Sequence, residues 1–324
     1  MKLILHIGSD KTGTTAIQSI LSNNRQILSD LGVCYPNLTK ATHHEELAHE
    51  IIRGQQGLAW KALREILKQD HKYVILSSEM LCTLNNKHIR VLKEWLGNID
   101  TTIIAYIRRS DEYLESGIKQ RLKGLQSKED FSRFYLKYKW IPAIFCPQVY
   151  ASAFKSRFIF NWLKVFRKDQ IRVRPYNNTQ WKENNIFQDF LHTAGLENYS
   201  EHLKGISQKK NVTPDIYTIY GVALFNNSSR PTVKTKFSET IINKYPSENH
   251  LISSYAKRYL ALKISQLYAK RLFKDFNVKL PVNEIAKESH RPSMSSIINI
   301  GQSRLIEFAI TQQKQINQLK KRKT

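Results

Sequence analysis

The chain has 324 residues, of which 41% are hydrophobic and 10% aromatic, ordinary values for a globular protein with a substantial core. It contains no run of 18 apolar residues, so the sequence predicts no membrane-spanning helix. Lysine and arginine number 51 against 27 aspartate and glutamate, and the net charge of +24 favours anionic ligands such as nucleotides, acidic glycans or lipid headgroups.

The three cysteines, Cys34, Cys82 and Cys146, are widely spaced and show no metal-ligand pattern. They fit a reducing compartment better than a disulfide framework, and we expect a cytoplasmic location. The segment Met1–Gly8 is too short for the core of a signal peptide, so we expect it to contribute the first strand of the mature chain.

Strand and helix patterns alternate through the first 200 residues. In chain order they predict strand Leu3–Ile7, helix Thr14–Asp30, strand Tyr73–Ser77, helix Asn86–Gly97, strand Thr102–Ile107, helix Ser110–Lys123, strand Ile171–Arg174 and helix Asn184–Ala194. This alternation predicts an α/β fold, a three-layer sandwich with a central parallel sheet. Ligands of such sheets bind beyond the carboxyl ends of the strands.

The last third of the chain shows no strand pattern. We therefore predict a core domain over residues 1–200 and a helical C-terminal extension over residues 201–324, packed on that core. Apolar residues at helical spacing predict an amphipathic helix over Asn249–Phe273, with its lysines and arginines on a solvated face. A sharper alternative is a contact with a polyanion or a membrane surface, because residues 230–324 carry 19 lysine and arginine against 6 acidic residues.

The segment Gly8–Thr15 (Gly-Ser-Asp-Lys-Thr-Gly-Thr-Thr) follows a predicted strand and opens a predicted helix. Glycines, backbone amides and the helix dipole make such a turn a cradle for anions. A loop for ATP or GTP carries its lysine directly after the last glycine. Here Thr14 takes that place, and Lys11 lies two residues before Gly13. No aspartate ends the second or third predicted strand, which weighs against a magnesium-nucleotide enzyme.

The run His6–Gln18 resembles the 5′-phosphosulfate loop of sulfotransferases that use 3′-phosphoadenosine 5′-phosphosulfate (PAPS), whose core is Lys-[Ser/Thr]-Gly-Thr-Thr. The resemblance implies a P-loop-type fold and transfer of a sulfuryl group from PAPS to an acceptor hydroxyl, leaving 3′-phosphoadenosine 5′-phosphate. It covers roughly the first 220 residues. The donor-binding residues that it implies in the loop are Gly8, Lys11, Thr12, Gly13, Thr14 and Thr15.

A second half-site follows the third predicted strand. The guanidinium of Arg108 offers a planar fork of donors suited to phosphate, and Ser116 lies eight residues later. Members of the family carry an arginine and a serine at this spacing, so the resemblance implies that Arg108 and Ser116 hold the 3′-phosphate. Arg109 is the second choice. Ser110 stands where many members have proline and can cap the next helix.

Weaker similarity is carried by Ile171–Tyr176 and Lys210–Pro214, which a strand end and a helix cap explain equally well. The Arg-Lys-Gly stretch that binds the 3′-phosphate in animal small-molecule sulfotransferases is not evident. Lys209 and Lys210 are the candidates to replace it.

Transfer to a hydroxyl needs a base, and we rank three candidates: His44, then His43, then Glu79. A histidine is neutral near physiological pH and can accept a proton, whereas Glu79 would need burial to serve well. The alternatives are an exposed helix start for the two histidines and a charged helix cap for Glu79. Lys11 is the expected catalytic cation, because charge grows on the leaving phosphate. We expect no metal ion.

Two other functions stay open. One is a nucleotide kinase, and the other is a non-catalytic basic protein that binds acidic glycans or lipids. For the sulfotransferase, the expected acceptor is a hydroxyl of a carbohydrate or another envelope-associated molecule. We expect no nucleic-acid partner, and the charge is compatible with peripheral contact with an anionic membrane. The sequence does not predict the oligomeric state.

Overall fold

The computed structural model describes residues 1–38, 42–125, 127–206, 215–225, 251–280 and 293–321. The chain divides into two compact units. Unit 1 comprises Met1–Arg109, Phe154–Asn211 and Ser265–Pro281, and unit 2 comprises Ser110–Ala153, Val212–Ile264 and Val282–Thr324. This division differs from the predicted boundary at residue 200, because the segment 110–153 groups with C-terminal helices rather than with the sheet.

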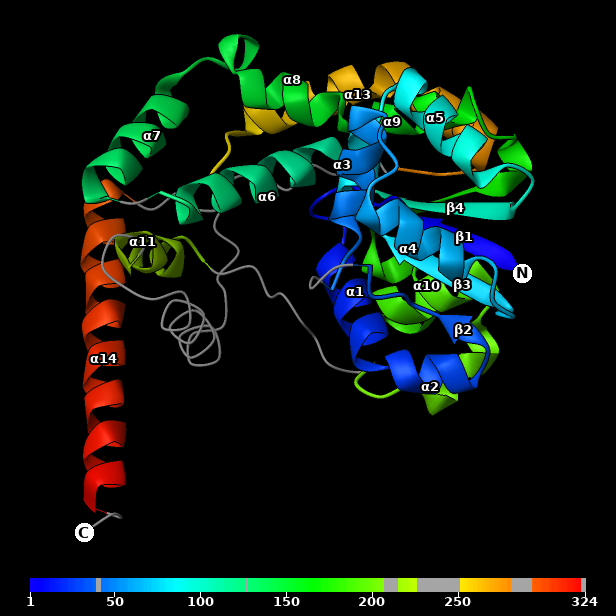
Figure 1. Cartoon of the computed structure of the whole chain (residues 1–324). Helices are drawn as coiled ribbons and strands as arrows, with labels where there is room; N and C mark the ends of the chain where they lie inside the picture. The colour runs from blue at the N-terminus through cyan, green and yellow to red at the C-terminus, as the bar shows by residue number, and fades with distance from the viewer. Residues whose placement is uncertain (39–41, 126, 207–214, 226–250, 281–292, 322–324) are drawn as a thin grey trace. The chain divides into compact units, whose positions relative to one another are not determined.

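Unit 1 is built on a five-stranded parallel sheet in the order β2-β3-β1-β4-β5 (Figure 1). The strands are β1 (Lys2–His6), β2 (Val33–Cys34), β3 (Tyr73–Ser77), β4 (Asp100–Ile107) and β5 (Ile171–Pro175). In the centre, Ile4 of β1 pairs with Ile75 of β3 and Thr102 of β4. The predicted α/β class with a parallel sheet is confirmed. Strand β2 was not predicted, because a strand of two residues is too short to show a hydrophobic pattern.

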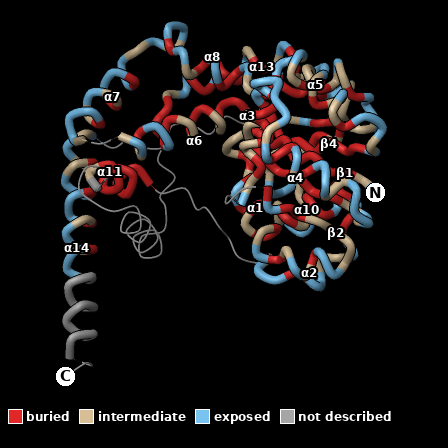
Figure 2. Tube along the Cα trace, in the orientation of Figure 1, coloured by how far each residue is buried: buried red, intermediate tan, exposed pale blue. Residues whose placement is uncertain are grey.

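Helices cover both faces of this sheet. Leu3 and Leu5 of β1 face one apolar cluster, while Ile4 faces the other, as the two-residue period of a strand requires. The first cluster is shared with α3 (Glu45–Arg53), α4 (Leu58–Ile66), α5 (Asn86–Leu96) and α9 (Phe158–Leu163); the second with α1 (Thr14–Asn23), α2 (Arg25–Asp30) and α10 (Ile186–Ala194). Figure 2 shows the strands as the most continuously buried part of the unit.

The predicted helix Thr14–Asp30 is two helices that meet at Asn24. The buried Asn24 side chain donates to the carbonyl oxygens of Ile20 and Lys204 and accepts from the amide of Lys204. A residue 180 positions away in the chain therefore fixes this break, and no local pattern could have revealed it.

Seven short 3₁₀ turns complete the described connections. They span Glu79–Thr83, Ala143–Phe145, Lys155–Arg157, Lys168–Gln170, Asn178–Gln180, Lys182–Asn184 and Glu197–His202.

The described secondary-structure elements of unit 2 are all helices. It contains α6 (Ser110–Lys123), α7 (Lys128–Trp140), α8 (Pro147–Ala153), α11 (Ile216–Phe225), the first half of α13 (Tyr255–Phe276) and α14 (Met294–Lys321). Its apolar cluster draws on all six helices; Leu114 and Ile118 of α6 pack there with Tyr220 and Ile297. That burial explains why α6, although it directly follows β4, belongs to this unit.

Charged groups are buried inside unit 2. Arg304 forms a buried ion pair with Asp215, with 2.6 Å between Nη1 and Oδ1. Lys257 and Arg258 of α13 are each 2% exposed, so these two basic residues do not lie on the solvated face predicted for this helix. Of the helices in the described part of the chain, none combines the length and the apolar character that a bilayer-spanning segment needs.

Candidate active site

Within unit 1, the carboxyl ends of four parallel strands bring chemistry-bearing residues to one edge of the sheet. Strand β1 leads into the loop Gly8–Thr15, and β3 is followed by Glu79. Strand β4 is followed by Arg108, and β5 by Tyr176. Neighbouring parallel strands end at the same edge, which is where ligands of such sheets bind.

The loop after β1 wraps a helix N-terminus. Gly13 adopts the left-handed conformation with φ of 77°, directly before α1, and Lys11 does so with φ of 64°. The Thr12 hydroxyl donates to the carbonyl oxygen of Ser9 at 2.5 Å, and this buried hydrogen bond closes the turn. No side chain among the described residues caps α1. A turn with left-handed residues at a helix start turns its amides toward an anion.

Two glycines are required by this geometry. A Cβ on Gly13 would lie 3.1 Å from Cε2 of Tyr176, and the positive φ already disfavours any side chain. A Cβ on Gly8 would lie 2.7 Å from Cγ2 of Thr14 and 2.8 Å from Nε2 of His6. The two glycines therefore hold the loop against the end of β5 and against β1.

Four side chains gather at the loop: Lys11, Thr14, Glu79 and Arg108, here called the loop site. The Thr14 hydroxyl donates a hydrogen bond to the carboxylate of Glu79. Burial lowers the pKa of Lys11; the charges of Asp10 and Glu79 oppose that shift, and the charge of Arg108 adds to it. The loop site thus holds two cations beside one carboxylate.

Arg108 contacts the loop directly. Its Nη1 donates to the carbonyl oxygen of Lys11 at 3.0 Å, and its guanidinium lies over the ring of Tyr176, 5.1 Å from the centroid. A second cation, Lys155, is paired with Asp10 of the loop, with 2.5 Å between Nζ and Oδ1. Sequence reasoning missed Lys155, because nothing local marks it. Tyr176 could have been found, since it follows the last predicted strand.

His44, the first-ranked base, lies in the protein interior. Its Nδ1 accepts from the Ser77 amide at 2.9 Å, which leaves Nε2 to donate to the carbonyl oxygen of Pro36 at 2.9 Å. Burial lowers its pKa to about 4. Because both ring nitrogens are engaged with backbone, neither is available to take a proton from an acceptor. The prediction for His44 is therefore corrected: it anchors the start of α3 to β3.

Ser77 is the centre of a neutral hydrogen-bonded layer beneath the loop site. Its Oγ accepts from Nε2 of Gln18 at 3.1 Å and bonds Nδ1 of His6 at 2.8 Å. His6 is fully buried, and burial lowers its pKa to about 3. We call His6, Gln18, His44 and Ser77 the support layer.

His43 stands at the start of α3, with its Nδ1 3.7 Å from a carboxylate oxygen of Glu45. This matches the alternative of an exposed helix start. Of the three ranked bases, only Glu79 bonds a residue of the loop. Its neighbour Ser78 caps the turn that begins at Glu79 by accepting from the amide of Met80.

The remaining predicted site residues lie in unit 2, outside the described residues, or in the first turn of α1. Ser116 lies on α6 in unit 2, and its pairing with Arg108 stays a prediction. Lys209, Lys210 and the segment Lys210–Pro214 lie outside the described residues. Thr15 follows Thr14 in the first turn of α1 and is exposed, as a ligand-facing position would be.

No family model matches the chain. The chain is similar to an uncharacterized protein of Archaeoglobus fulgidus, with 31% identity over 126 residues. The matched region covers 38% of this chain and 30% of the archaeal protein, so the chain spans less than a third of that relative's length. Because this relative is uncharacterized, the similarity indicates no activity for the chain. The function is therefore inferred from the geometry of the loop site.

Proposed function

We propose that the protein is a sulfotransferase that moves a sulfuryl group from PAPS to a hydroxyl of a carbohydrate or another envelope-associated acceptor. The observation that carries the proposal is the position of the loop lysine. Lys11 takes a left-handed conformation before the last glycine, and Arg108 bonds its carbonyl oxygen. An anion at the start of α1 is therefore met by Lys11 as well as by backbone amides, in a loop that Arg108 braces.

The proposed reaction needs alignment and charge stabilisation more than covalent chemistry. The bond between sulfur and the bridging phosphate oxygen breaks, and a bond between sulfur and the acceptor oxygen forms. Lys11 stabilises the charge that grows on the leaving phosphate. Glu79 takes the proton of the acceptor hydroxyl, and Thr14 orients its carboxylate by donating to it. The products are the sulfated acceptor and 3′-phosphoadenosine 5′-phosphate.

Glu79 also supports a second candidate, a magnesium-dependent nucleotide kinase. A carboxylate beside the phosphate loop, at a strand end, is where such enzymes hold their metal. The two functions separate on one requirement: a kinase loses its turnover when EDTA removes magnesium, whereas the sulfotransferase reaction as proposed uses no metal in its steps.

A cytoplasmic location is part of the proposal. All three cysteines are free thiols, and burial raises the pKa of Cys82 to about 11. Buried, unpaired cysteines are compatible with a reducing compartment.

The experiment that tests the proposal compares 3′-phosphoadenosine 5′-phosphate with ADP by calorimetry. The first carries a 3′-phosphate that ADP lacks, and a charged hydrogen bond to phosphate contributes about 1.5–3 kcal/mol. We expect at least tenfold tighter binding of the first nucleotide, since about 1.4 kcal/mol corresponds to a factor of ten. Equal affinities would contradict the proposal.

The Arg108→Ala variant sharpens that comparison. If Arg108 holds the 3′-phosphate, the variant loses affinity for 3′-phosphoadenosine 5′-phosphate and keeps its affinity for ADP. If Arg108 acts only by holding the loop through Lys11, both affinities fall together. Arg53→Ala, an exposed arginine on α3, is the matched control and should change neither affinity.

A further inference from the structure

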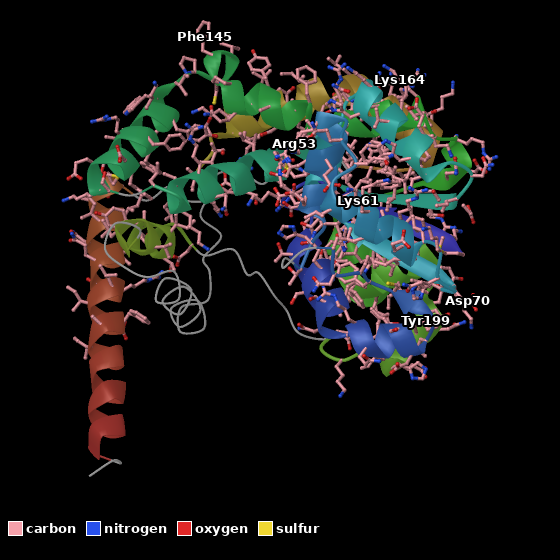
Figure 3. All side chains as sticks on the ribbon, in the orientation of Figure 1. Arg53, Lys61, Asp70, Phe145, Lys164 and Tyr199 are labelled. Atoms are coloured by element: carbon pink, nitrogen blue, oxygen red, sulfur yellow. The ribbon has the colours of Figure 1, made fainter. Side chains whose placement is uncertain are left out.

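The connection between α7 and α8 presents large apolar side chains to solvent. Trp140 is 76% exposed, Phe145 is 68% exposed and Ile144 is 59% exposed; Leu136, one turn before Trp140 on α7, is 41% exposed. We call these four residues the α7–α8 corner. Figure 3 shows Phe145 at the outer turn of this connection. Apolar residues clustered in this way on a surface mark an interaction site.

The corner is an ordered turn. Pro142 precedes it, and the Pro142 carbonyl oxygen accepts from the amide of Phe145 at 3.0 Å. The Tyr150 hydroxyl donates to the carbonyl oxygen of Ile144 at 2.8 Å. Directly after the turn, Cys146 is fully buried and anchors it to the core of unit 2. The exposed side chains are thus held outward by structure on both sides.

A buried cation fixes the end of α7 where Trp140 lies. Lys257 of α13 is 2% exposed, and its Nζ donates to the carbonyl oxygen of Tyr138 and, at 3.4 Å, to that of Lys139. A cation at the last carbonyls of a helix satisfies them and complements the helix dipole. The Tyr138 hydroxyl is held in turn by Ser253 at 2.7 Å. The backbone directly before Trp140 is therefore held by the unit's own core.

The charged residues of the segment that carries the corner are of one sign. From residue 131 to residue 153 the chain has no acidic residue, and its three basic residues, Arg133, Lys137 and Lys139, are all exposed. Glu129 and Asp130 lie in the first turn of α7, at the opposite end of that helix. The Lys139 ammonium lies 5.8 Å from the ring centroid of Trp140. An anionic surface with an apolar interior complements this arrangement.

We propose that the α7–α8 corner is a membrane-binding site that inserts its apolar side chains between the headgroups of an anionic lipid bilayer. Tryptophan, phenylalanine and isoleucine at an exposed turn, next to lysines, are the side chains that partition into the headgroup boundary. The three lysine and arginine residues bind the headgroup phosphates. This site differs from the contact predicted through the basic C-terminal segment. It goes beyond the proposed function and does not depend on it.

Vesicle flotation with the full chain tests this proposal. The probe is vesicles of phosphatidylcholine mixed with phosphatidylglycerol, compared with phosphatidylcholine alone. We expect binding to the anionic vesicles. The double variant W140S/F145S should bind about tenfold or more weakly, because serine lacks the favourable free energy of transferring an aromatic side chain from water into the bilayer. Leu58→Ser is the matched control: Leu58 is 82% exposed, on α4 of unit 1, and its removal should leave flotation unchanged.

Charge reversal tests the electrostatic part. The K137E/K139E variant should lose binding roughly tenfold or more, since each basic side chain near an anionic surface contributes several-fold in affinity. The matched control is K61E/R64E, two exposed basic residues on α4. The main-chain carbonyl of Lys139 that accepts from Lys257 is retained in the reversal, so helix α7 keeps its end.

Each other outcome overturns the proposal. Absence of flotation, flotation without dependence on anionic lipid, or equal flotation by W140S/F145S and wild type would each exclude this corner as the membrane site. Concentration-dependent dimerisation that W140S/F145S abolishes, without flotation, would assign the corner to self-association instead. Affinity for 3′-phosphoadenosine 5′-phosphate, measured on W140S/F145S, should equal that of wild type and separates this test from that of the proposed function.

Discussion

The loop site and the support layer lie against each other in unit 1, yet they are built on opposite principles. The loop site gathers charged groups: the charge of Glu79 raises the pKa of Lys11, and the charge of Arg108 lowers it. The support layer is neutral, and His44 uses both ring nitrogens to bond backbone groups. The difference separates the two candidate bases: the Glu79 carboxylate bonds the phosphate-type loop, whereas His44 has no ring nitrogen left for a ligand.

The largest expected effect comes from replacing each of the two candidate bases in a separate variant. Glu79→Gln should reduce turnover by roughly 10²–10⁴-fold with donor affinity kept, because the amide cannot take the proton. His44→Ala should instead lower the free energy of unfolding by about 1–3 kcal/mol, because it leaves the Ser77 amide and the Pro36 carbonyl without their partner.

Turnover with labelled PAPS and the free energy of unfolding from chemical denaturation are measured on both variants. Glutamine keeps the size of Glu79, so a loss of turnover at unchanged stability isolates the proton transfer. If His44→Ala loses turnover at unchanged stability while Glu79→Gln stays active, the two roles are reversed and our correction fails.

The pH dependence of stability reports on the support layer. The pKa values of His6 and His44 are about 3 and about 4 in the folded protein, against 6.5 as the ordinary value. Between these values the unfolded chain binds more protons than the folded protein. The free energy of unfolding should therefore be fully retained above pH 6.5 and fall as the pH drops toward 4, by at most about 1.4 kcal/mol per pH unit for each histidine.

Urea unfolding at a series of pH values measures this slope. His44→Gln removes one titrating group and should flatten the slope between pH 6.5 and 4, although its stability at pH 7 is lower. An unchanged slope in this variant would mean that His44 is not the buried neutral group described above.

The smallest expected effect concerns backbone strain at Lys11. A non-glycine residue with φ of 64° costs about 1 kcal/mol or somewhat more. Lys11→Gly relieves that strain but loses the ammonium group, so its stability should match or exceed that of Lys11→Ala while turnover falls equally in both. Thermal unfolding of the two variants measures the difference. Greater stability of Lys11→Ala would show that the left-handed conformation carries no strain.

Much of the fold and part of the site could be predicted from the sequence. The boundaries of β3 and α6 match because a continuous apolar run marks the strand and helical spacing marks the helix, and the Gly8–Thr15 loop follows from local residue types. The role of His44 could not be predicted, because its two partners lie 8 and 33 residues away. Lys155 reaches Asp10 across 145 positions of the chain, and no local pattern encodes such a contact.

The division into two units could not be predicted from local sequence patterns either. Helix α6 was correctly predicted as a helix, but its apolar face packs against α11, whose sequence lies about a hundred residues later. The pairing of Arg108 with Ser116 rests on spacing and resemblance, and stays a prediction. Sequence patterns thus predict elements well, while the partners of buried faces depend on the whole chain.

The most direct test of the central claim is transfer of labelled sulfate from PAPS to a panel of glycans and small alcohols, in the presence of EDTA. Wild type should label at least one acceptor, and Lys11→Ala should do so roughly 10²–10³-fold more slowly at saturating donor, because the charge on the leaving phosphate loses its cation. Lys2→Ala, at the opposite end of β1, should match wild type. Transfer that proceeds equally without the Lys11 ammonium, or phosphate transfer from ATP that EDTA abolishes, would contradict the account.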